Sequence, residues 1–63
     1  MKYDKKIKTL ITSIQQDTQA YSDYVNTFGN TCAYTDRMVE SIIKNSKELE
    51  KTYNKQVKIL ENF

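Results

Sequence analysis

The chain of 63 residues contains one cysteine, one glycine, no histidine and no proline, and its ten basic and eight acidic residues give a net charge of +2. One cysteine cannot form an internal disulfide, and without histidine the common zinc ligand sets cannot be built. The small basic excess does not fit a dedicated nucleic-acid binder.

A chain of this length buries a limited fraction of its apolar surface, so it usually needs disulfides, a metal or association with other chains for stability. Association is the route that the composition leaves open. No apolar run approaches the roughly 18 residues of a membrane span, and residues 1–10 lack the apolar stretch of a signal peptide. We therefore expect a cytoplasmic protein without cofactor or metal.

The first predicted helix covers about residues 4–28, with Asp4 as the expected N-cap. Its lysines between Lys2 and Lys8 are interpreted as a solubilising N-terminal turn. The apolar positions follow a heptad repeat that is interrupted at Asp17. They are Tyr3, Ile7, Leu10, Ile14, Tyr21, Tyr24 and Phe28.

Residues 26–36 read NTFGNTCAYTD and have low helix propensity. Gly29 stands where a left-handed C-cap would follow Phe28, and Asn30 or Thr31 is expected to cap the next helix. The sequence therefore favours a break near residues 28–35 and a helical hairpin. The alternative is one long helix with a stutter in its heptad repeat.

The second predicted helix covers about residues 31–62. One of its faces carries residues at steps of three or four, and these are Val39, Ile42, Ile43, Ser46, Leu49, Tyr53, Val57 and Leu60. Continuing the heptad frame of the first helix would instead place Asn45, Thr52 and Gln56 on the seam. In a hairpin, the last turns of the second helix would extend past the first and need cover from another chain.

Catalysis is not expected, because Cys32 has no histidine to serve as its base and is interpreted as a small buried apolar residue. Carboxylates such as Glu48 and Glu50 point to different sides of a helix. We expect a single all-α module, residues 1–63, that binds other protein chains by helix packing as a homo- or hetero-oligomer, without specific nucleic-acid binding. Its expected interface residues are Ile7, Leu10, Ile14, Tyr21, Tyr24, Phe28, Val39, Ile42, Ile43, Leu49, Tyr53, Val57 and Leu60.

The segment YVNTFGNTC, Tyr24 to Cys32, and the seam that ends at residues 59–61 resemble the small coiled-coil subunits of actin-regulatory complexes: Brick of the WAVE complex and its counterpart in the WASH complex. The resemblance covers residues 24–61 and implies a helical subunit that joins a trimeric coiled coil with larger subunits. The sequence departs from the family pattern at Gly29, Ser46 and Tyr53. Two alternatives are a small inhibitor or regulator of mobile-element or phage type that binds one target protein, and a homo-oligomeric assembly protein.

Overall fold

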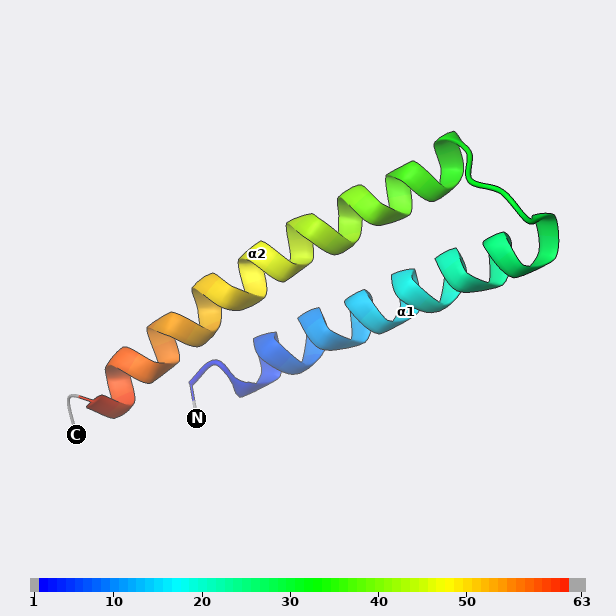
Figure 1. Ribbon diagram of the computed structural model, residues 1–63. Coiled ribbons are helices and arrows are strands. Elements are labelled where there is room, and N and C mark those ends of the chain that lie inside the picture. Colours follow the sequence, from blue (N-terminus) through cyan, green and yellow to red (C-terminus); the bar gives the residue numbers. More distant parts are fainter. Residues whose placement is uncertain (1, 62–63) are drawn as a thin grey trace.

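The computed structural model, which describes residues 2–61, is an antiparallel hairpin of two helices (Figure 1). Helix α1 spans Asp4–Phe28 and helix α2 spans Ala33–Glu61, so the predicted all-α hairpin is confirmed. The second helix begins at Ala33, two residues later than predicted, because residues 31 and 32 belong to the turn. Its predicted end at residue 62 lies outside the described residues.

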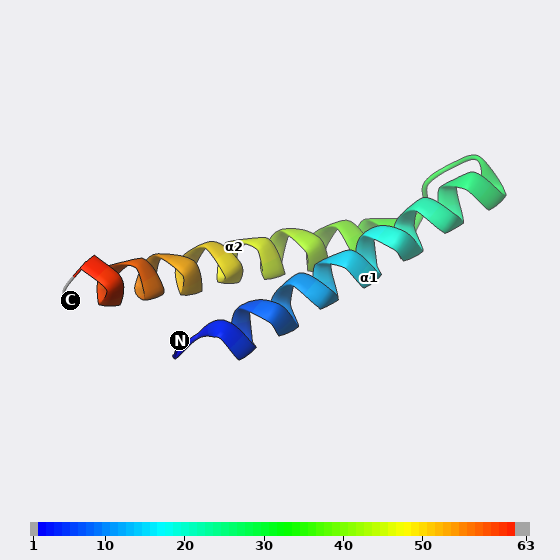
Figure 2. The ribbon, with the colours of Figure 1, turned by 90° about the horizontal axis from the view of Figure 1, so that it is seen from below.

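The hairpin is long and thin, with extents of 51 × 14 × 11 Å. Its two helices lie side by side and cross at a shallow angle (Figure 2). Two adjacent helices enclose few side chains on all sides. Among the described residues, Met38 is the one apolar residue that is buried, with 8% of its surface exposed.

Gly29 ends α1 in the left-handed conformation that the sequence predicts. Its φ is 72°, and its backbone N–H donates to the carbonyl of Val25 at 2.7 Å. This bond satisfies one of the carbonyls that the end of a helix leaves without an intrahelical partner. At the other end of α1 the prediction is wrong, because Tyr3 occupies the N-cap position without a side-chain capping bond and Asp4 is the first helical residue.

The start of α2 is capped by a hydrogen-bonded pair that differs from the prediction. The carbonyl of Cys32 accepts the backbone N–H of Asp36 at 3.0 Å, which makes Cys32 the N-cap residue in place of Asn30 or Thr31. The hydroxyl of Thr35 accepts the Cys32 N–H and donates to the Cys32 carbonyl, both at 2.8 Å. A side chain that reaches back to the N-cap backbone is half of a capping box.

The two helices contact each other through one continuous heptad frame. On α1 the half-buried positions of this frame are Tyr3, Ile7, Leu10, Ile14, Asp17, Tyr21 and Tyr24. On α2 the buried and half-buried positions are Thr35, Met38, Ile42, Asn45, Leu49, Thr52, Gln56 and Ile59. We call these two sets together the inner seam. The contact positions of α2 therefore follow the same heptad numbering as those of α1, counted without a break through the turn.

The inner seam is polar on the α2 side, where four of its eight positions are Thr, Asn or Gln. Thr35 and Thr52 are almost fully buried, at 0% and 2% exposure. A hydroxyl or amide contributes less hydrophobic stabilisation than a leucine or isoleucine side chain would at the same position. Of the apolar face expected on α2, Ile42 and Leu49 lie on the inner seam. Of its other residues, Val39, Ser46, Tyr53 and Leu60 are exposed.

The turn explains this choice of frame. It has only four residues, 29–32, so α2 cannot rotate far about its own axis relative to α1. The Gly29 cap, the bonds between Thr35 and Cys32, and a bond from Cys32 to Tyr24 fix the direction in which α2 leaves the turn. The short turn and these bonds constrain the phase of α2, which places Met38, Ile42 and Leu49 on the inner seam together with its polar residues.

The left-handed cap gives the first testable prediction. Replacing Gly29 with alanine adds a Cβ that would meet no heavy atom within 4 Å, so any cost comes from the backbone conformation. Alanine is strained at positive φ, and we expect Gly29→Ala to lower the free energy of unfolding by about 1 kcal/mol. Gln16→Ala, at an exposed position inside α1, is the control and should change it by a few tenths. Thermal unfolding followed by circular dichroism measures both; a higher melting temperature for Gly29→Ala would contradict the hairpin.

Candidate functional site

A stripe of mainly apolar residues runs along the side of α2 next to the inner seam and borders the space between the helices. Its large apolar members are substantially exposed: Val39 by 38%, Ile43 by 48%, Tyr53 by 56% and Leu60 by 51%. The stripe consists of Val39, Ile43, Ser46, Glu50, Tyr53, Val57 and Leu60, and we call it the outward stripe. Residues at alternating steps of four and three lie on one face of a helix, so this stripe is continuous over about six turns.

Helix α1 adds two isoleucines to this surface. Ile7 and Ile11 form the floor of a shallow groove between the helices, and Ile11 is 40% exposed. The α2 side of the groove is formed by Ser46, Leu49, Glu50 and Tyr53. Apolar side chains of both helices thus converge on one side of the hairpin. We refer to this feature as the groove.

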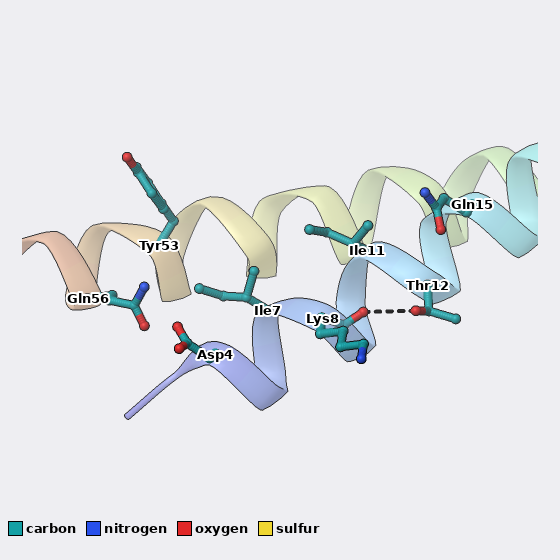
Figure 3. Close-up of a pocket in the computed structure, with 8 residues that line it drawn as sticks. All are labelled: Asp4, Ile7, Lys8, Ile11, Thr12, Gln15, Tyr53 and Gln56. Atoms are coloured by element: carbon teal, nitrogen blue, oxygen red, sulfur yellow. Dashed lines mark hydrogen bonds between the residues drawn. The ribbon is translucent and has the colours of Figure 1, made fainter. Parts of the chain in front are cut away.

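The groove continues toward the N-terminal end of α1 (Figure 3). Asp4, Lys8 and Gln56 line this end beside Ile7, and Gln15 lines the other end beyond Ile11. The Oε1 atom of Gln56 is buried and has no hydrogen-bond partner within the described part of the chain. A buried polar atom without a hydrogen-bond partner costs free energy, so Gln56 destabilises this end of the inner seam.

The opposite side of the hairpin is polar and carries the side-chain bonds that join the two helices. Lys6 Nζ lies 2.9 Å from Glu48 Oε1, and the Ser41 hydroxyl donates to Asp17 Oδ2 at 2.7 Å. The lysine lowers the pKa of the Glu48 carboxyl by hydrogen bonding and by its charge. An exposed ion pair adds little stability. The two sides therefore differ in chemistry, with charged and hydroxyl groups on one and apolar side chains on the other.

An aromatic cluster surrounds the turn. The ring of Tyr24 lies 4.5 Å from that of Phe28 and 5.5 Å from that of Tyr34, measured between ring centroids. Cys32 is half-buried beside it, which corrects the expectation of a buried apolar residue. Its Sγ lies 3.1 Å from the Tyr24 hydroxyl. This bond gives one of the predicted seam tyrosines a partner for its hydroxyl.

The Cys32–Tyr24 bond changes the acidity of both groups. The hydroxyl of Tyr24 donates a hydrogen bond to the thiolate, which lowers the pKa of Cys32, and the backbone N–H groups at the start of α2 act in the same direction. The same bond raises the pKa of Tyr24.

The expected interface residues divide into two groups. Eight are half-buried: Ile7, Leu10, Ile14, Tyr21, Tyr24, Ile42, Leu49 and Val57. Five are exposed: Phe28, Val39, Ile43, Tyr53 and Leu60. The sequence prediction missed Ile11, although its position four residues after Ile7 is the signal that could have placed it beside the groove. It also missed Met38, which lies on the continued frame.

No group of three His, Cys, Asp or Glu side chains lies close enough to hold a metal ion within residues 2–61. Over the same range, neither helix combines the length and apolar character needed to cross a bilayer. The geometry of these residues therefore offers no cluster for metal chemistry. The outward stripe and the groove are its most distinctive surface.

Comparisons with protein-family models, curated proteins and solved structures found no match for this chain. The resemblance of residues 24–61 to small coiled-coil subunits stays a prediction. The feature of the hairpin that bears on its function is the difference in chemistry between its two sides.

The Tyr24–Cys32 bond gives the second testable prediction. Tyr24→Phe removes the hydroxyl that stabilises the thiolate, so the pKa of Cys32 should rise. At a given pH, a smaller fraction of Cys32 should then be present as thiolate. Alkylation of Cys32 by iodoacetamide, measured as a function of pH, should become slower and its pH midpoint should move upward. Tyr21→Phe is the matched control and should leave the profile unchanged. An identical profile for Tyr24→Phe would contradict the bond.

Proposed function

We propose that this protein is a non-catalytic interaction module that binds another protein chain through its outward stripe and groove. The single observation that carries the proposal is the inversion of polarity between the faces of α2. Threonine, asparagine and glutamine occupy half of its inner seam, whereas Val39, Ile43, Tyr53 and Leu60 are exposed. Contiguous exposed apolar surface bordered by polar residues is typical of protein interaction sites.

The accessible surface of the chain supports the proposal. A compact monomer of 7.4 kDa exposes about 4,200 Å², whereas this hairpin exposes 5056 Å². The excess of about 850 Å² is close to the roughly 800 Å² that each partner buries in a standard protein interface. One interface of ordinary size would bring the chain to the burial that is normal for its mass.

The chemistry of the stripe favours a protein over other ligands. It has one charged residue, Glu50, and no lysine or arginine, so it is not a surface for phosphate groups. Leucine, valine, isoleucine and tyrosine at helical spacing match the apolar face of another helix. A subunit of an actin-regulatory complex, an inhibitor of one target protein and a homo-oligomer would all use such a surface. Pull-down of several stoichiometric subunits would favour the first, and loss of activity of one bound enzyme the second.

The third testable prediction concerns the end of the outward stripe. Leu60→Asp places a carboxylate in the interface, where an unpaired charge costs several kcal/mol, so assembly should be lost. Lys58→Asp, two residues away and exposed, should change the assembly free energy by well under 1 kcal/mol. Size-exclusion chromatography of the tagged chain in extracts of its native cells measures both variants, whatever the partner.

The wild-type chain and Lys58→Asp should elute together in a species larger than the free chain, and Leu60→Asp should elute as the free chain. Helix content measured on the purified variants separates loss of binding from loss of folding. If Leu60→Asp elutes with the wild type, the C-terminal turns are not an interface and the proposed function is wrong.

A further inference from the structure

We propose that the outward stripe is occupied by a second copy of this chain, packed so that α2 lies antiparallel to the partner's α2 across a two-fold axis near Glu50. The product is a four-helix dimer in which the two turns point to opposite ends. This inference rests on the proposed function and specifies its partner. It follows from three properties of the stripe: its area, its register and its fit to the groove.

The surface of the chain leaves room for a dimer interface. The whole hairpin exposes about 850 Å² more than a compact monomer of its mass, and an interface that covered this excess on two copies would bury about 1,700 Å² in total, within the standard range. The stripe runs from Val39 to Leu60, about 32 Å at 1.5 Å per residue, so two stripes can cover each other over their full length. A single partner helix lying in the groove alone would leave Val39 and Leu60 uncovered at its two ends.

The register is self-complementary. In an antiparallel pair centred near Glu50, Val39 faces Leu60 of the other copy, Ile43 faces Val57 and Ser46 faces Tyr53. Each pair occurs twice, because a two-fold interface exchanges the two members. The apolar pairs lie at both ends of the stripe and the polar groups lie together at its centre. The last turns of α2 are then covered by the first turns of the partner's α2.

The groove receives the largest side chain of the stripe. Tyr53 is 56% exposed, and in this register its ring meets the partner's surface at Ser46, which lines the groove beside Ile7 and Ile11. The ring is then covered by two isoleucines, and its hydroxyl can donate to the serine hydroxyl. Each hairpin thus has both a Tyr53 side chain and a groove. The two-fold axis places the Tyr53 of each copy at the groove of the other.

The other face-to-face arrangement brings α2 of one copy onto α1 of the other. The stripe would then meet Gln15, Thr18 and Ser22, which are the exposed residues of α1 beyond Ile11 on this side. Pairing α2 with α2 puts apolar surface against apolar surface and leaves these polar residues in water. The distribution of apolar residues between the helices therefore selects the α2–α2 arrangement.

Glu50 is the one charged member of the stripe and lies nearest to the axis. In the dimer the two Glu50 carboxylates approach each other, and like charges that face each other weaken an interface. The dimer is therefore weaker than its apolar contacts alone would make it. Replacing Glu50 by glutamine should strengthen association. A variant that folds poorly would associate more weakly, so a folding defect cannot produce this result.

Sedimentation equilibrium of the purified full-length chain is the first measurement. We expect a monomer–dimer equilibrium in the wild type, a dissociation constant lowered by about fivefold in Glu50→Gln, and no such change in Glu40→Gln on the solvated face. A purely monomeric wild type would overturn the second copy as partner. The proposed function would still stand if a Leu60-dependent assembly exists in native extracts, so the two failures are distinguishable. Weaker association of Glu50→Gln would overturn the position of the axis.

Disulfide cross-linking tests the register. Ser46→Cys and Tyr53→Cys are made separately in a Cys32→Ser background and oxidised alone and as a mixture. Antiparallel α2–α2 packing predicts a mixed disulfide between positions 46 and 53 and little 46–46 or 53–53 product. In this register the two copies of position 46, or of position 53, lie seven residues apart along the helix axis, which is about 10 Å. A disulfide cannot join Cα atoms more than about 7 Å apart. A parallel pair would give the two homodisulfides instead, and α2–α1 packing would give none. Either result would overturn the proposed dimer.

Discussion

The rotational phase of α2 relative to α1 decides which α2 side chains meet α1 and which are exposed. A turn of four residues connects the helices, and the Gly29 cap, the Thr35 bonds and the bond from Cys32 to Tyr24 constrain how α2 leaves it. Once α2 leaves the turn in this phase, its helical geometry determines whether each residue up to Ile59 faces α1 or solvent. Thr52 and Asn45 then face α1, and Tyr53 and Leu60 face outward.

This phase has an energetic consequence. The contact within the chain buries two threonines and one methionine and leaves the isoleucines and leucines of the inner seam half-buried. Its hydrophobic burial, which offsets the loss of chain entropy, is therefore small. Val39 and Ile43 remain at the surface. In the proposed assembly, association would supply further stabilisation through these exposed residues.

Sequence periodicity predicted the two helices, their hairpin connection and the glycine cap, because these depend on local propensity and on one residue at positive φ. It did not predict which face of α2 would meet α1. On α2 the outward stripe has four aliphatic residues, and the inner seam has three and one methionine. Apolar content therefore did not distinguish the two faces. The turn supplies a further constraint, through the bonds of Thr35 to Cys32 and of Cys32 to Tyr24.

We propose that the hairpin gains stability from another chain that packs against its outward stripe. Thermal unfolding of the purified protein over a roughly hundredfold range of concentration tests it most directly, because association with the folded state makes the melting temperature depend on concentration. We expect the melting temperature to rise with concentration in the wild type. A melting temperature that stays constant over this range would show a hairpin that is stable alone and would contradict the account.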